Sequence, residues 1–222
     1  MPYIGLALYA EGPTDYRFLT PLLTRLVEDI YLGSPRDVLE LGAMIELDTP
    51  EAFRDAPRER RIIEAANDAA GGFHILFVHA DGMSRPATIR RQQIEPGLNG
   101  FLAQVLEYRY AGVAVVPIRE MEAWAIWDGD ALRKAFGSTL SDAELGIPTR
   151  AREVEREPDP KNVLDNAYAA VTGRRRDHAD TAAAFLTLIA EAVDLSKLSS
   201  LRAFRTLRRE TELAMRSLNL IE

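Results

Sequence analysis

The sequence FHILFVHADG, residues 73–82, contains the clearest β-strand of the chain. Its first seven residues are almost all apolar, and the run stops at Ala80-Asp81-Gly82, where Asp-Gly is a common turn dipeptide. A short apolar run without polar alternation is typical of a strand buried on both faces, as the strands of parallel sheets are. We therefore expect a central parallel strand here, followed by a loop that carries Asp81.

Three further segments have the character of strands, and helical patterns separate them. Strands are expected at residues 4–10, 38–47, 73–79 and 112–118. Helices are expected between them, after residue 14 and over residues 58–70 and 87–108. Strands that alternate with helices predict an α/β fold: a Rossmann-like, mostly parallel sheet flanked by helices on both faces.

The first of these helices contains a proline. Thr14 is the expected N-cap, and Pro21 stands inside the apolar pattern that continues to Ile30. Because proline lacks an N–H and crowds the preceding turn, we expect either a restart with Thr20 as a new cap or a kink.

Strand patterns end after Trp124, and residues 142–222 are typical of helices joined by loops. We therefore predict an α/β domain over residues 1–137 and a helical C-terminal extension over residues 138–222 that packs on it. Trp124 and Trp127 are expected to belong to the core or to the junction between the two parts.

Composition excludes several kinds of chemistry. The chain has 222 residues and no cysteine, which excludes disulfide frameworks, cysteine-ligated zinc and thiol nucleophiles. Any metal must therefore be held by oxygen or imidazole ligands.

The apolar run near the start is shorter than the ~18 residues that a membrane span needs, and no basic residues precede it. We expect a cytoplasmic protein without a membrane anchor.

The charge of the chain is uneven. The 27 Lys and Arg residues against 34 Asp and Glu give a net charge of −7, which argues against coating nucleic acid by bulk electrostatics. Residues 161–222 hold ten basic and eight acidic residues, or +2, which leaves −9 for residues 1–160. A contact with nucleic acid would therefore use a local basic surface.

Acidic residues follow the predicted strands repeatedly. Glu11 follows the first strand, Asp81 the third, and Glu120 and Glu122 the fourth, while Asp15 lies four residues after Glu11. Because the carboxyl ends of parallel strands share one edge of the sheet, these carboxylates can meet there. Crowded carboxylates repel one another, and Mg²⁺ or Mn²⁺ is the natural compensation. The sequence thus predicts a metal site suited to phosphoryl transfer or phosphodiester hydrolysis.

Each acidic residue also has a simpler interpretation. Asp15 could stabilise a helix N-terminus, Asp81-Gly82 could be only a turn, and Glu122 could be a solvated helix residue. Glu11 is harder to dismiss, because a carboxylate at the end of a buried strand is costly without a partner.

The order of these motifs resembles the Toprim superfamily. Glu11-Gly-Pro-Thr-Asp15, then His79-Ala-Asp-Gly82 after a hydrophobic strand, then Glu122-Ala-Trp124, is similar to the bacterial Toprim-like family called domain of unknown function 4276. The similarity extends into the tail, through Asp159-Pro-Lys161 and residues 194–204. The Toprim pattern has an aspartate where this chain has His79.

The resemblance implies a metal-dependent nuclease that acts on nucleic-acid phosphodiesters, and DNA rather than RNA is the expected partner. Overcoming-lysogenization-defect nucleases share the four-residue spacing of Glu11 and Asp15. The resemblance to the Toprim family also implies an ATPase partner protein, an anti-phage role and a homo-oligomer. Glu11, Asp15 and Asp81 would hold the metal with help from Glu120 and Glu122, and His79 would be a substitute ligand or general base. The alternative is a catalytically silent Toprim-fold subunit that binds an ATPase.

Several basic residues are candidates for phosphate or nucleic-acid contact. Lys161 is the candidate for stabilising charge at the scissile phosphate, although a surface lysine is an equally simple interpretation. Arg85 and Arg119 could bind phosphate or only neutralise the acidic edge. The remaining candidates are Arg174, Arg175 and Arg176, and the set Arg202, Arg205, Arg208 and Arg209, whose simpler interpretation is a solvated helix face.

Overall fold

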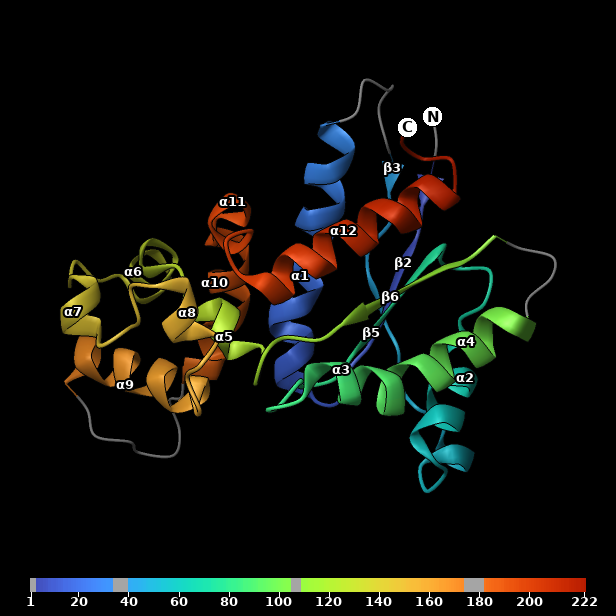
Figure 1. Ribbon diagram of the computed structural model, residues 1–222, viewed down its shortest axis with the longest axis horizontal. Helices are drawn as coiled ribbons and strands as arrows, with labels where there is room; N and C mark the ends of the chain where they lie inside the picture. The colour runs from blue at the N-terminus through green and yellow to red at the C-terminus, as the bar shows by residue number, and fades with distance from the viewer. Residues whose placement is uncertain (1–2, 34–39, 105–108, 174–181) are drawn as a thin grey trace.

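A four-stranded parallel sheet forms the centre of the computed structural model, which describes residues 3–33, 40–104, 109–173 and 182–222 (Figure 1). The strand order is β4-β2-β5-β6, and every neighbouring pair is parallel. The strands are β2 (Leu6–Tyr9), β4 (Ile45–Glu46), β5 (Ile75–His79) and β6 (Ala111–Val115). The predicted α/β architecture with a mostly parallel sheet is confirmed.

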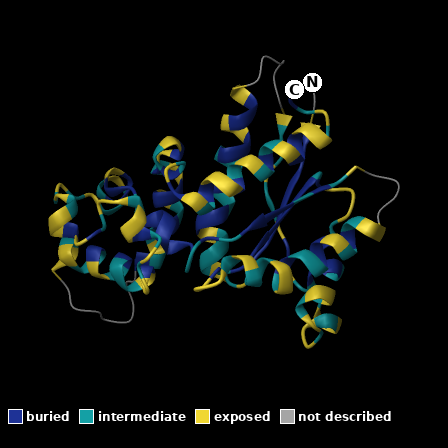
Figure 2. Cartoon of the chain, in the orientation of Figure 1, coloured by how far each residue is buried: buried dark blue, intermediate teal, exposed yellow. Residues whose placement is uncertain are grey.

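Helices cover both faces of the sheet, because its strands are apolar on both sides. Leu8 and Phe77 belong to a core shared with α1 (Pro13–Leu32) and α12 (Arg202–Ser217). Alternate strand residues such as Leu76 and Val78 belong to a second core shared with α2 (Arg58–Asp68) and α4 (Glu95–Gln104). Figure 2 shows the buried sheet between helices whose outer faces are exposed.

The first predicted strand divides at Gly5 into β1 (Tyr3–Ile4) and β2. A Cβ at Gly5 would lie 2.4 Å from the Gly72 carbonyl oxygen, so only glycine allows this approach of two backbones. On the N-terminal side of Gly5, β1 pairs with β3 (Glu40–Leu41), and on its C-terminal side β2 pairs with β4. The weak strand predicted over 38–47 is accordingly two short strands, β3 and β4.

The first long helix, α1, runs from Pro13 to Leu32. The restart at Thr20 is therefore wrong, and the alternative of a kink at Pro21 stays a prediction. Pro21 frees the Arg17 carbonyl four residues earlier, and the Thr187 hydroxyl donates a hydrogen bond to this oxygen at 3.1 Å. The expected cap is also wrong, because Gly12 rather than Thr14 is the N-cap.

The remaining helices are short. Between β5 and β6 lie α3 (Pro86–Ile89), a π-helical turn (Arg90–Ile94) and α4, and residues 105–108 of the predicted helix lie outside the described residues. Two 3-10 turns occur at Glu51–Phe53 and Ala182–Phe185. After β6 come α5 (Glu122–Ala125), α6 (Gly129–Phe136), α7 (Asp142–Leu145), α8 (Ala151–Val154), α9 (Pro160–Thr172), α10 (Leu186–Ala192), α11 (Leu195–Leu198) and α12.

The C-terminal helices share the core of the sheet. α12 packs on β6, and α10 packs on α1 and α6. The buried Trp124 ring meets Phe204 edge to face at a centroid distance of 5.5 Å, which confirms Trp124 as a core residue. Trp127 is half-buried and donates from Nε1 to the Lys197 carbonyl. The boundary predicted at residue 137 stays a prediction. No helix among the described residues is both long and apolar enough to cross a lipid bilayer.

Candidate functional site

Two loops at the carboxyl edge of the sheet carry most of the predicted acidic residues. Asp81 lies two residues beyond the end of β5, and Glu120 and Glu122 lie shortly beyond the neighbouring strand β6. Met83 and Arg119 tie the loops together through an isolated antiparallel bridge, with amide-to-carbonyl distances of 3.0 and 3.1 Å. The topology therefore brings these acidic residues to one place.

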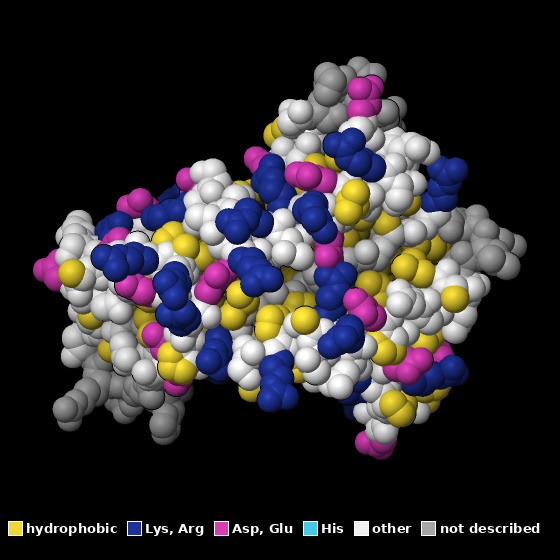
Figure 3. Space-filling view, in the orientation of Figure 1, with side chains coloured by type: hydrophobic (Ala, Val, Ile, Leu, Met, Phe, Trp, Pro, Cys, Tyr) yellow, Lys and Arg dark blue, Asp and Glu magenta, His cyan; other side chains and the backbone are white. Residues whose placement is uncertain are grey.

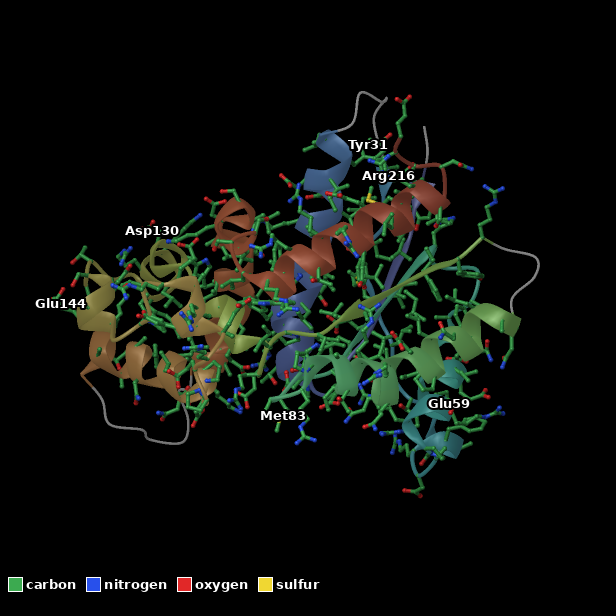
Figure 4. All side chains as sticks on the ribbon, viewed as in Figure 1. Tyr31, Glu59, Met83, Asp130, Glu144 and Arg216 are labelled. Carbon is green, nitrogen blue, oxygen red and sulfur yellow. The ribbon has the colours of Figure 1, made fainter. Side chains whose placement is uncertain are left out.

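The backbone at this bridge is strained. Met83 has a φ of +50° and Arg119 a φ of +70°, both in the left-handed region that non-glycine residues seldom adopt. A Cβ at Gly82 would lie 2.1 Å from the Pro117 carbonyl oxygen, so the approach of the two loops requires glycine there. Met83 is exposed at the edge of the molecule beside α3 (Figure 4).

Burial and neighbouring charges raise the pKa values of two glutamates behind this bridge. Burial raises the pKa of Glu122 to about 7, and the charges of Glu120 and Asp81 add to the effect. Burial, Asp81 and Asp159 also raise the pKa of Glu120, which Lys161 opposes. Glu120 and Glu122 thus lie in a region, near Asp81, that disfavours their negative charge.

His79 is buried beside this cluster, with an exposed fraction of 1%. Its Nδ1 lies 3.0 Å from the Val115 carbonyl oxygen and therefore carries the proton of that hydrogen bond. Its Nε2 lies 3.5 Å from Asp81 Oδ1, a distance that suits an ion pair but exceeds an ordinary hydrogen bond. Burial lowers the pKa of His79, but the carboxylates of Asp81 and Asp15 outweigh burial and raise it overall.

Three buried polar atoms at the site lack hydrogen-bond partners among the described residues: His79 Nε2, Asp81 Oδ1 and Glu120 Oε2. A buried carboxylate oxygen without a donor is costly, and a cation would satisfy both of the oxygens in this set. The donor set fits Mg²⁺ or Mn²⁺, which prefer oxygen ligands.

Glu11 reaches the same edge of the sheet but pairs with an arginine. Its Oε1 lies 2.7 Å from Arg58 Nη1, and the side chain is half-exposed. Arg58 also donates to the His79 carbonyl at 2.6 Å and to the Gln93 carbonyl at 3.0 Å. Sequence reasoning missed Arg58, which begins an ordinary surface helix and follows no strand.

Asp15 caps the helix that follows Glu11. Its Oδ2 accepts the backbone amides of Glu11 at 3.1 Å and of Gly12 at 2.9 Å. The interpretation of Asp15 as a residue that stabilises the helix N-terminus is confirmed, and its role as a metal ligand stays a prediction.

Among the side chains that the structure describes, no three His, Asp or Glu stand in position to hold one metal ion together. The side chains of Asp81, Glu120 and Glu122 would therefore have to reorient to hold one ion together. To bind the same ion, the Glu11 side chain would have to break its ion pair with Arg58.

The basic candidates have different environments. Lys161 is exposed in the first turn of α9, close enough to lower the pKa values of Glu120 and Glu122. Arg85 is exposed at the start of α3, and Arg119 is half-buried at the loop bridge. Arg174, Arg175 and Arg176 lie outside the described residues.

The arginines of α12 lie on a face of mixed charge. Arg208 pairs with Asp29 at 2.7 Å, and Glu210 pairs with Arg90. Figure 3 shows basic and acidic side chains interspersed over the face that carries this helix. These contacts favour the interpretation of a solvated, ion-paired face.

Comparison with protein-family models, with curated proteins and with solved structures finds no match to this chain. The resemblance to Toprim proteins therefore rests on the motifs and their order, and the fold supports it only at the level of a parallel α/β sheet.

Proposed function

We propose that the chain is a Toprim-fold, divalent-metal-dependent nuclease, or the nuclease-like subunit of a larger complex. The observation that carries the proposal is the cluster of Asp81, Glu120 and Glu122 at the carboxyl edge of the sheet, in which two buried carboxylate oxygens lack hydrogen-bond donors among the described residues. Bringing like charges together is costly, and a bound cation would offset that cost.

In this proposal Asp81, Glu120 and Glu122 would hold Mg²⁺ or Mn²⁺. When bound, such an ion would polarise a phosphate oxygen and supply a hydroxide nucleophile. Lys161, which lies close enough to Glu120 and Glu122 to lower their pKa values, would stabilise charge on the phosphate. The raised pKa of His79 favours the form protonated on both ring nitrogens, in which Nε2–H faces Asp81, so His79 would orient Asp81 rather than accept a proton.

The preference for DNA over RNA, the ATPase partner and the anti-phage role come from the family resemblance and stay proposals. A catalytically silent subunit that docks on an ATPase is the second candidate. The ion pair of Glu11 with Arg58 favours it, because this contact occupies a carboxylate that the Toprim pattern assigns to catalysis.

Thermal unfolding in Mn²⁺ or Mg²⁺ tests the metal site. At about 100-fold excess over the dissociation constant a bound ion stabilises by ~2.7 kcal/mol, which corresponds to roughly 5–10 °C for a chain of this size. Asp81→Asn and Glu120→Gln should melt at or above the wild-type temperature without metal, because like charges are removed, and should lose the response. Glu59→Gln, an exposed residue on α2 (Figure 4), is the matched control.

Cleavage assays then separate the two candidate functions. Single-stranded DNA, duplex DNA and RNA are incubated with wild type and with Asp81→Asn in Mn²⁺. Metal-dependent cleavage that the substitution abolishes supports the nuclease. A metal response without cleavage favours the silent subunit, and a flat metal response contradicts both the metal site and the nuclease.

A further inference from the structure

A hollow of about 920 Å³ has Glu11 among its lining residues, and the bridge residues Met83 and Arg119 do not line it. The end of β2, the first half of α1, the segment after β4 and the start of α2 form its walls. Its volume lies within the range of small-molecule binding sites, roughly 300–1,000 Å³, and so suits one small ligand rather than a double helix.

Three arginines line the hollow: Arg17, Arg58 and Arg61. Arg58 is fully engaged by Glu11 and two backbone carbonyls. The side chains of Arg17 and Arg61, in contrast, have no ion pair or hydrogen bond within the described part of the chain, and Arg61 Nε is buried. A buried guanidinium N–H without an acceptor indicates a missing anionic partner, and phosphate matches the fork of donors that arginine presents.

The lining of the hollow also offers acceptors and an aromatic ring. Glu46 and Asp48 line it, and Glu46 Oε1 accepts from the Thr20 hydroxyl at 2.8 Å. Tyr16 is held rigidly, since its hydroxyl accepts from the Ala10 amide at 3.0 Å and donates to the Leu47 carbonyl at 2.7 Å. Burial raises the pKa of Tyr16 to about 12, so the ring stays neutral.

These walls define the ligand by its chemistry. Arg61 Nε, which is buried without an acceptor among the described residues, and the exposed Arg17 favour an anion. The exposed carboxylates of Glu46 and Asp48 can accept hydrogen bonds from hydroxyl or amino groups of a ligand, whereas a simple inorganic anion would meet only the arginines. A nucleotide has a phosphate at one end, hydroxyl and amino donors elsewhere, and a planar base that can lie against an aromatic ring.

We propose that this hollow binds a single nucleotide through Arg61 and Arg17, either as a free nucleotide or as the terminal nucleotide of a single strand. Binding of the terminal nucleotide of a strand rests on the proposed nuclease function. Glu11 borders both the hollow and the candidate metal site, and Arg58 links Glu11 to the His79 backbone, so a strand seated in the hollow leads toward Asp81.

Calorimetric titration in EDTA tests the proposal without any contribution from divalent ions. The probes are adenosine monophosphate, thymidine monophosphate, inorganic phosphate, a short 5′-phosphorylated single-stranded oligothymidylate, and a blunt duplex. We expect a mononucleotide or the single strand to bind, and Arg61→Gln to weaken that binding about tenfold or more, as the loss of a charge-assisted hydrogen bond does. Arg54→Gln, an exposed arginine near the start of α2 and not among the residues that line the hollow, should bind as the wild type does.

Binding of the mononucleotides identifies a free ligand, and binding of the oligonucleotide alone identifies a strand end. The proposal is overturned if neither binds, if Arg61→Gln leaves the affinity unchanged, or if phosphate or the duplex binds as tightly. If Arg61→Gln does not fold, the exposed Arg17→Gln provides the same comparison.

The metal response of the same preparations is measured separately. Mn²⁺ stabilisation without nucleotide binding contradicts only the nucleotide site. Nucleotide binding without a metal response contradicts only the proposed function.

Discussion

At the scale of single residues, the site is defined by which charged groups find partners. Glu11 has Arg58 and Asp15 has two backbone amides. Asp81, in contrast, lies 3.5 Å from His79 Nε2, and its charge and that of Glu120 act on Glu122. Because the carboxylates follow strands, their common location could be predicted from the sequence. Arg58 could not, since only folding brings the start of a surface helix against the end of β2.

The raised pKa of Glu122 predicts a pH-dependent stability. Its pKa is about 7 in the folded chain against 4.5 ordinarily, so the folded state favours the protonated form. The free energy of unfolding should therefore fall as pH rises from about 4.5 through 7, by on the order of 3 kcal/mol. Urea denaturation across this range should show a flatter profile for Glu122→Gln, and parallel profiles would refute the assignment.

The ion pair of Glu11 with Arg58 predicts that Arg58→Gln lowers the stability of the fold but raises its affinity for a metal ion. Arg58→Gln removes hydrogen bonds to two carbonyls and should lower the free energy of unfolding by about 1–3 kcal/mol. Glu11→Gln affects a half-exposed pair and should cost less than about 1 kcal/mol.

If Glu11 is a metal ligand, Arg58→Gln should also bind Mn²⁺ more tightly in a calorimetric titration, because the carboxylate is released. Unchanged Mn²⁺ affinity would show that Glu11 takes no part in the site.

At the scale of elements, continuous apolar runs were sufficient to place β2, β5 and β6. A short apolar run that ends at turn residues is typical of a parallel strand buried on both faces. The errors have distant causes. The strand breaks at Gly5 because the Gly72 backbone approaches it, and α1 continues through Pro21 because Thr187 satisfies the freed carbonyl. Neither contact is visible in the local sequence.

The loop bridge beside the site predicts a specific requirement for Gly82. Gly82→Ala should destabilise the chain by about 1–3 kcal/mol, since the added methyl group would overlap the Pro117 carbonyl, and it should weaken the metal response by separating Asp81 from Glu120. Gly33→Ala meets only ordinary contacts and has a negative φ, so it should be neutral. Thermal unfolding with and without Mn²⁺ checks both, and an unaffected Gly82→Ala would contradict the described approach of the loops.

At the scale of the whole molecule, the sheet depends on helices from the end of the chain. α12 covers β6 and α10 covers α1, so residues of both predicted parts belong to one core. Hydrophobic periodicity predicted these helices, but it could not show which faces of the sheet they cover.

A chain of residues 1–137 should therefore not fold alone, because the loss of α10 and α12 exposes the apolar sides of α1 and β6 to water. Circular dichroism during heating should show no cooperative transition for this fragment, in contrast to the full chain. A sharp transition would instead establish residues 1–137 as an independent domain.

Direct Mn²⁺ binding is the decisive test that distant carboxylates assemble into one cation site. Electron paramagnetic resonance of free Mn²⁺ at neutral pH should show its signal decrease as wild-type protein is added. Asp81→Asn and Glu122→Gln should leave most of the ion free, and Glu59→Gln should behave as the wild type does. Equal Mn²⁺ binding by all four proteins, or none by the wild type, would contradict the account.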